Sequence, residues 1–300
     1  MSASDSLLER VGFGRVLVPL DGSEFALAAL PTARALSERF KAELVTISVA
    51  DDEDEARRLR RHAVESLASG DGADHIQVAV STAVAETITA QVAELAPCLL
   101  CMSTRGRGRV AGTVIGSVAR AVLRSTREPL IAVGPLADRP GSLVGPSRRR
   151  PASWPEPLSV RRLVACVDGS PTSEAVLPVA ARWATALDMQ LSVLTIAEEA
   201  APLGDQPAPN RFGPVEPARY VEQLADRWTE VIPDAVGEVA FDPLSVASGL
   251  RAHLATQPAG LVTVTTHART GLNRIRLGAA AADIVRTSTA PTLVVPLADL

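Results

Sequence analysis

Three groups of residues in the first half of the chain are of the types that hold a phosphorylated nucleoside. Asp21 follows one apolar run, Val49 closes a second, and the loop 103–117 follows a further apolar run. Glycines in this loop allow close approach of a ligand to the backbone, and N–H groups at a helix start attract phosphate. Asp21 can accept hydrogen bonds from a ribose or base edge, and the Ser117 hydroxyl can donate one. Together these residues predict a nucleotide pocket.

The elements that must position these groups alternate between strand and helix. Apolar runs predict strands at 15–20, 43–49, 76–80, 98–102 and 129–133, with helices over 23–40, 83–95 and 116–125. A further helix begins in the acidic segment after residue 50, where Glu53–Arg57 and Asp54–Arg58 are predicted as i,i+4 pairs on a solvated face. This alternation predicts a parallel sheet, in which ligands bind beyond the carboxyl ends of the strands. The candidate residues all lie at such ends.

The second half of the chain repeats the first. The segment 16–23 returns as 163–170, an offset of 147 residues. At the loop that begins with Thr265 the offset has grown to 162, so the second copy carries 15 extra residues, which fall in the Pro- and Gly-rich segment 200–217. A period of this length indicates a duplicated domain rather than a short solenoid repeat.

The predicted fold class is α/β, with two similar doubly wound domains, each a five-stranded parallel sheet flanked by helices. The predicted boundaries are 11–136 for the first domain, 137–159 for a linker and 160–297 for the second domain. A chain of 300 residues supports this division, because each half is long enough to bury its own core. The linker is rich in Pro, Gly and Ser, as expected for a connecting segment.

The amino-acid composition of the chain argues against several classes of function. Apolar residues make up 47% of the chain but aromatic residues only 3%, which suits strands buried under helices on both faces. The net charge of −4 argues against nucleic acid as a partner, and no stretch reaches the roughly 20 apolar residues of a membrane span. The start of the chain lacks the pattern of an export signal. Cys98, Cys101 and Cys166 lie in apolar runs, as expected for buried thiols in the cytoplasm.

The loop of the first copy carries a resemblance to a known family. Gly106, Gly116 and Ser117 match an ATP-binding pattern of glycine, two residues, glycine, nine residues, then glycine with serine or threonine; Ser103 replaces the first glycine. On these residues and the repeated strand–turn segments, nearly the whole chain resembles a tandem universal stress protein. The resemblance implies a Rossmann-like fold and ATP as ligand, with or without Mg²⁺. It also implies a nucleotide-responsive regulator or binding protein in a stress or growth-arrest response.

The same resemblance assigns residues of the first copy to the two ends of the ligand. Those at the adenine and ribose end are Pro19, Leu20, Asp21, Val49 and Met102. Those at the phosphate end are Ser103, Arg105, Gly106, Gly116, Ser117 and Val118. We therefore expect the first copy to bind ATP.

The second copy resembles the family over 266–272 but has lost most of the phosphate-binding pattern. Thr265 and Ala268 replace the two early glycines, Ala279 replaces the hydroxyl residue, and only Gly278 remains. A methyl group at a tight or positive-φ position costs about 1 kcal/mol, and a lost hydrogen bond to a charged group costs about 1.5–3 kcal/mol. Weak binding or none is therefore expected at the corresponding residues, which are Asp168, Ile196, Thr265, His267 and Gly278.

The sequence predicts no catalytic residues and no metal site. Its four histidines form no cluster at metal-ligand spacing, and no nucleophile has a base and an orienting acid at readable spacing. Three interpretations stay open. The first is an ATP-binding stress protein whose nucleotide state alters partner contacts, the second a scaffold of the same fold without nucleotide, and the third a nucleotide-using enzyme such as a slow ATP hydrolase.

The fifth strands of the two copies, Pro129–Val133 and Pro291–Val295, are expected at sheet edges. Unpaired strand edges seek partners. The family resemblance implies that these two strands pair with each other about a pseudo-twofold axis, so that one chain mimics a family dimer. A homodimer of the whole chain is compatible with that arrangement.

Overall fold

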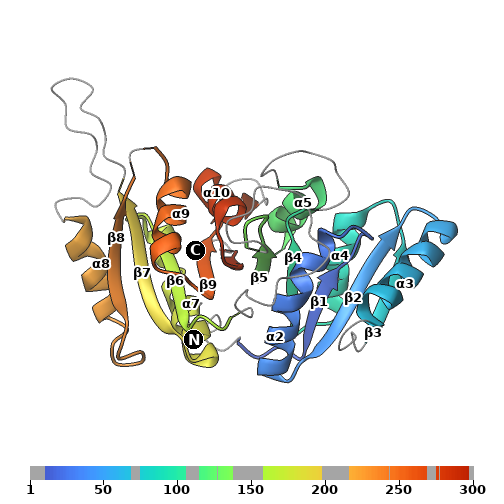
Figure 1. The fold of residues 1–300 in the computed structure, drawn as a ribbon, viewed down its shortest axis with the longest axis horizontal. Coiled ribbons are helices and arrows are strands. Elements are labelled where there is room, and N and C mark those ends of the chain that lie inside the picture. The colour runs from blue at the N-terminus through green and yellow to red at the C-terminus, as the bar shows by residue number, and fades with distance from the viewer. Residues whose placement is uncertain are drawn as a thin grey trace.

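Ten strands of the described part of the chain form one continuous sheet (Figure 1). The structure is a computed structural model, and it describes residues 11–68, 75–105, 115–126, 128–137, 158–197, 216–242, 244–268, 275–276 and 278–296. The strand order is β3-β2-β1-β4-β5-β12-β9-β6-β7-β8, so each half contributes five neighbouring strands. Within each half all the strands run parallel, as the sequence predicted.

Strands and helices alternate along the first half. Its elements are β1 (Arg15–Pro19), η1 (Ala26–Ala29), α2 (Leu30–Phe40), β2 (Glu43–Ala50), α3 (Glu53–Ala68), β3 (His75–Val80), α4 (Val84–Glu94), β4 (Cys98–Ser103), α5 (Ser117–Ser125) and β5 (Leu130–Val133). The five predicted strands are all present, with ends that differ by one residue at most.

The second half repeats this plan and adds a short two-stranded sheet. Its elements are β6 (Arg162–Val167), α6 (Pro171–Glu174), α7 (Leu177–Leu187), β7 (Gln190–Ala197), α8 (Pro217–Asp226), β8 (Val236–Phe241), α9 (Val246–Thr256), β9 (Leu261–Thr265), β10 (His267–Ala268), β11 (Ile275–Arg276), α10 (Ala279–Thr287) and β12 (Thr292–Val295). The sequence did not predict the small sheet, in which β10 pairs with β11.

The helix predicted over 23–40 is instead divided in two. A 3-10 turn, η1, precedes α2, which restarts at Leu30 with a proline in its first turn. The second copy divides in the same way, between α6 and α7, and α7 also has a proline in its first turn. Proline lacks an N–H group and fits only the first turn of a helix, so each proline marks a new helix start.

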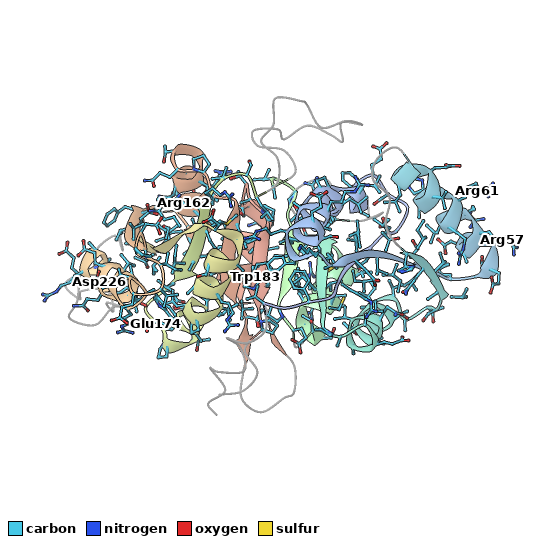
Figure 2. The ribbon with its side chains drawn as sticks, turned by 90° about the horizontal axis from the view of Figure 1, so that it is seen from below. Arg57, Arg61, Arg162, Glu174, Trp183 and Asp226 are labelled. Carbon is cyan, nitrogen blue, oxygen red and sulfur yellow. The ribbon has the colours of Figure 1, made fainter. Side chains whose placement is uncertain are left out.

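The ion pair described on α3 also differs from the prediction. Arg57 pairs with Asp54, three residues away, rather than with Glu53, and both side chains are exposed. The acidic residues before the helix act mainly as caps: Asp52 accepts a hydrogen bond from the Glu55 N–H at 2.7 Å. Figure 2 shows Arg57 and Arg61 at the outer end of the molecule. This helix face is solvated, as expected.

Helices cover both faces of the sheet. Buried residues of α2, α3, α7 and α8 pack on one face, and those of α4, α5, α9 and α10 pack on the other. Each of these two apolar cores contains residues of both halves. No helix in the described ranges combines the length and the apolar character that crossing a membrane requires.

The halves meet where β5 pairs with β12. The two strands run antiparallel with Ile131 opposite Leu293, which are equivalent residues of the two copies. Thr292 lies opposite Ala132 and Val294 opposite Leu130, so the pairing is symmetric about its centre. The predicted pairing of the fifth strands is therefore present, and the two five-stranded sheets become one.

Candidate nucleotide site

The candidate residues of the first half gather where the strand order reverses. β1 lies between β2 and β4, and the chain leaves β1 in one direction and returns on its other side. Pro19 ends β1 opposite Ile47, and the Leu20 N–H donates to the Ile47 carbonyl at 2.8 Å. Val49 lies close to the end of β2, and Met102 close to the end of β4. Reversal points of this kind are where open α/β sheets bind ligands.

Asp21 is held by the turn that it begins. Its Oδ1 atom accepts hydrogen bonds from the Ser23 N–H at 2.9 Å and the Ser23 hydroxyl at 2.6 Å. Gly22 has φ of 80°, which a residue with a side chain rarely adopts. The Ser23 hydroxyl in turn accepts from the Ala26 N–H at 3.2 Å, which ties the turn to the start of η1. The carboxylate is thus oriented before any ligand arrives.

The strand β4 delivers the phosphate-side residues. Ser103 is its last residue and is absent from the residues with positive φ, so serine in place of glycine causes no backbone strain there. The Ser103 hydroxyl accepts from the Arg105 N–H at 3.2 Å. The Arg105 guanidinium lies 5.7 Å from the centre of the Phe25 ring, close enough for a cation–π contact. A positive charge therefore lies between the end of β4 and the segment that follows Asp21.

Gly116 places no side chain at the start of α5. Its N–H donates to the Thr104 carbonyl at 2.8 Å, which ties the helix start to the end of β4. Its φ of −59° and ψ of 157° are open to any residue, and an added Cβ would lie 3.4 Å from the Thr104 oxygen. Neither backbone strain nor packing requires glycine here. Glycine instead adds no side chain over the N–H groups of the first turn of α5. Ser117 and Val118 are the first two residues of that turn.

Part of the predicted phosphate loop lies outside the described residues. Gly106 and the arginines that follow it, Arg107 and Arg109, lie in this part outside the described residues. The described part contains no group of three or more histidine, cysteine or acidic side chains arranged to hold a metal ion.

The second half keeps the turn and changes the loop. Asp168 accepts hydrogen bonds from the Ser170 N–H at 3.1 Å and the Ser170 hydroxyl at 2.6 Å, and Gly169 has φ of 84°. Ile196 lies near the end of β7 and Thr265 ends β9. Gly278 precedes α10 with φ of −60°, like its counterpart in the first half.

The loop after β9 folds back on itself. His267 lies in β10 opposite Arg276 of β11, and Ala268 lies opposite Ile275. Extended pairing of this kind means that a positive φ at Ala268, one of the two predicted sources of strain, is not required. The β11 strand packs against α5 of the first half.

A tyrosine and a glutamate flank the Asp168 turn in the second half. The Tyr220 hydroxyl, carried by α8, donates to Glu174 Oε1 at 3.0 Å. Burial, then the Glu174 carboxylate, raise the pKa of Tyr220, which keeps its hydroxyl protonated. The first copy has Leu27 at the position of Glu174, so only the second copy places a carboxylate there. Sequence analysis missed this pair, although Tyr220 is the only tyrosine of the chain.

Comparison with known proteins agrees with the duplicated fold. The universal stress protein family profile matches residues 12–134 and 159–296. A universal stress protein of Mycobacterium tuberculosis is 28% identical over 239 residues, which span 77% of this chain and 68% of that protein.

Solved structures share the fold of the whole chain. A putative universal stress protein of Pseudomonas aeruginosa superposes with a TM-score of 0.61 at 17% identity, covering 97% of this chain and 95% of its own. A universal stress protein of Archaeoglobus fulgidus gives a TM-score of 0.57 at 17% identity, covering 94% and 97%. The family profile matches both halves, and the chain therefore belongs to the universal stress protein family, with one family domain in each half.

Proposed function

We propose that this protein binds one molecule of ATP in its first half and binds nucleotide weakly or not at all in its second half. The observation that carries the proposal is the start of α5, where Gly116 contributes no side chain, beside the reversal point of the first sheet half. A helix start attracts phosphate through its free N–H groups and its dipole. Gly116 has no role in backbone strain or packing that would explain the missing side chain, so a ligand is the simpler reason for it.

The residues present fit a nucleoside triphosphate. Asp21 offers a carboxylate for the ribose or base edge, while Val49 and Met102 offer apolar contacts for the base. Arg105 and the Ser117 hydroxyl are charged and polar donors for phosphate oxygens. An accompanying Mg²⁺ would neutralise part of the triphosphate charge and would be held mainly by phosphate oxygens and water.

The second half fits this ligand less well. Ala279 offers no hydroxyl at the start of α10, where the first half has Ser117. The Glu174 carboxylate, which Arg227 approaches to 3.8 Å, adds a negative charge beside the Asp168 turn that the first half lacks at the equivalent position, and this disfavours an anionic ligand. We infer a single ATP for each chain.

We further propose that the bound nucleotide regulates contacts with other molecules rather than undergoing rapid turnover. Neither a general base nor a nucleophile was recognisable in the sequence beside the phosphate-side residues. Membership of the family supports the proposal of a role in a response to stress or growth arrest, and we propose the cytoplasm as its location. A scaffold without nucleotide is the alternative, and a slow ATP hydrolase is a less favoured one.

Replacement of Gly116 tests the proposal. Gly116→Val covers the first turn of α5, and we expect ATP affinity measured by titration calorimetry to fall about tenfold or more. Gly278→Val is the matched control, because it makes the same change at the start of α10. We expect the control to leave ATP affinity and the stoichiometry of one per chain unchanged. Circular dichroism melting of both variants shows whether each one is folded.

Each contrary result favours a defined alternative. Two equivalent ATP molecules per chain would show that the second site is intact. No binding by the unmodified protein would favour the scaffold, and steady phosphate release with Mg²⁺ would favour the hydrolase. If Gly116→Val and Gly278→Val changed ATP affinity equally, the assignment of the site to the first half would be wrong.

A further inference from the structure

The pairing of β5 with β12 does not by itself distinguish the two halves. Ile131 lies opposite its equivalent Leu293, so either strand could pair as well with a second copy of itself. A symmetric edge of this kind permits three kinds of pair: first with second, first with first, and second with second. Pairing between chains would link molecules into dimers or filaments. Contacts outside the two strands must therefore determine which of the three kinds of pair is the most stable.

An aromatic cluster joins the halves at one corner of this interface. Phe13 and Phe40 of the first half lie 4.7 Å apart between ring centres, and Trp183 of α7 lies 6.1 Å from Phe13 and 5.8 Å from Phe40. Trp183 is only 3% exposed, and Figure 2 shows it near the middle of the molecule. Aromatic pairs at such distances attract beyond the effect of burial alone.

The duplicated positions are not aromatic. Leu36 is equivalent to Trp183, while Val160 and Leu187 are equivalent to Phe13 and Phe40. A pair of two first halves would therefore set Leu36 against the phenylalanines. A pair of two second halves would set Trp183 against Val160 and Leu187. Only the unlike pair brings the three aromatic rings together.

A close contact between the backbones of the two halves, at Gly134, restricts which residue can stand there. Gly134 follows β5 and lies against α10 of the second half, where an added Cβ would come within 2.1 Å of the Val285 carbonyl oxygen. Only glycine fits at this distance. The equivalent residue of the second copy is Pro296, whose ring carries the carbon that has no room here. Two second halves paired at the spacing seen at Gly134 would place Pro296 against Val285 and clash.

We infer that the interface between the halves is heterotypic: each half is built to pair with the unlike half and not with a second copy of itself. The aromatic cluster favours the unlike pair, and Pro296 acts against the pairing of two second halves. Specificity arises from such a combination of attraction and exclusion. The partner that fits each interface surface is thus the other half of this protein. This inference does not depend on nucleotide binding.

Native mass spectrometry of the protein cut between its halves tests the inference. A protease site placed within 138–157 is cleaved after the full chain has folded, so both halves enter the test as a complex. Isotopically heavy and light cleaved preparations are mixed, unfolded together in urea and refolded by dilution, and heavy–light pairs of unlike halves show that the partners have exchanged. Random pairing gives equal numbers of unlike and like pairs, and we expect the ratio of unlike to like pairs to exceed that value about tenfold. A random mixture, or a majority of like pairs, would overturn the inference.

Two variants of the full chain test the contacts themselves. Gly134→Ala places a Cβ against the Val285 carbonyl and should open the joint, so that light scattering gives a higher mass than the parent protein. Gly12→Ala is the matched control, because its added Cβ meets no atom within 4 Å. Trp183→Leu, which installs the first copy's residue, should raise the share of like pairs in the cleaved preparation severalfold. Gly134→Ala and Trp183→Leu proteins indistinguishable from the parent would show that these contacts do not choose the partner.

Discussion

Arg162 ties four elements together at the amino end of the second half's sheet, opposite the end that carries the Asp168 turn. Its guanidinium bonds to Glu238 of β8, to the Ser192 hydroxyl of β7 at 3.2 Å and to the Gln257 carbonyl at 2.6 Å. His253 of α9 lies 3.0 Å from the same guanidinium and 3.2 Å from Glu238. The Arg162, Glu238 and His253 side chains are 10%, 18% and 8% exposed, so the charges are largely removed from water.

The first half keeps the arginine without this network. Arg15 is equivalent to Arg162 and donates to the Leu95 carbonyl at 3.5 Å, and it pairs with Glu43, whose side chain is 50% exposed. Strand register and the duplication place Gln77 and Gln91 at the positions of Glu238 and His253. Neutral amides therefore stand in the first half where the second half has an acid and a base.

Glu238→Gln should destabilise the second half by about 3 kcal/mol, because it leaves the buried Arg162 cation without its carboxylate. Denaturant unfolding measures the change. Glu43→Gln is the matched control: it makes the same chemical change in an exposed pair and should cost less than about 1 kcal/mol. Equal losses in the two variants would show that burial does not set the strength of these pairs.

Asp242 predicts a pH-dependent contribution at the start of α9. Its Oδ1 accepts from the Leu244 N–H at 2.7 Å and the Ser245 N–H at 3.1 Å, and these bonds hold the pKa of Asp242 below its usual value. A carboxyl with a lowered folded pKa stabilises the fold above its unfolded pKa, and that stability is lost as the pH falls through the folded value. Asp242→Asn should therefore be less stable than the parent at pH 7. The difference should shrink in acid, and a difference independent of pH would contradict this assignment.

At the scale of elements, α8 lies directly on the backbone of β8. An added Cβ at Gly237 would come within 2.5 Å of the Val221 carbonyl carbon and the Glu222 nitrogen. Figure 1 shows α8 alongside β8 at the outer edge of the second half. The same helix carries Tyr220 to the Asp168 turn, so its seating also decides what flanks that turn.

Gly237→Ala should push α8 away from the sheet and cost about 1–3 kcal/mol, the range for overpacking. Hydrogen exchange should show the loss of protection in α8 before other helices. Gly14→Ala, where the added Cβ meets no atom within 4 Å, serves as the control. Unchanged protection of α8 in the Gly237 variant would mean that the helix can shift without loss.

The three thiols of the strands β4 and β6 lie in surroundings that disfavour the thiolate form. Burial raises the pKa of Cys98 to about 11 and that of Cys166 to about 12, and it raises the pKa of the fully buried Cys101 further. Because the thiolate is the reactive form, we expect no rapid reaction with a disulfide reagent at pH 8 in the folded protein. All three cysteines should react in denaturant. A fast-reacting thiol in the folded protein would contradict their position in the strands.

At the scale of the whole molecule, the two halves share both of their apolar cores. Separation of the halves would expose residues of both cores and the edges of β5 and β12. Folding of either half should therefore depend on the other. We therefore expect the two copies of the domain to unfold as one cooperative body.

A single unfolding transition is the expected consequence. All three tryptophans lie after residue 150, so fluorescence reports on the second half and the interface, while hydrogen exchange of β1 and β2 reports on the first half. The two measurements should give coincident denaturant midpoints. Two separate midpoints would show that the halves unfold independently.

Local patterns in the sequence determined the elements and the candidate residues. Apolar runs marked the strands, and Asp-Gly-Ser marked both turns, because these features depend on neighbours only a few residues away. The same local rules wrongly predicted one continuous helix over 23–40, where a new helix, α2, begins beside a proline. They also wrongly predicted that Arg57 pairs with Glu53 rather than with Asp54. Strand alternation also placed Pro19, Val49 and Met102 at one end of a sheet, since parallel strands end together.

Only the tertiary structure decided which residues meet across long separations. The Phe13–Phe40–Trp183 cluster, the Tyr220–Glu174 bond and the Arg162 network join segments that lie far apart in the chain. The spacing of these residues in the sequence does not predict their contacts, because the contacts depend on how the helices are placed on the sheet. The duplication explains the plan that both halves share, but packing across the joint makes the two copies different.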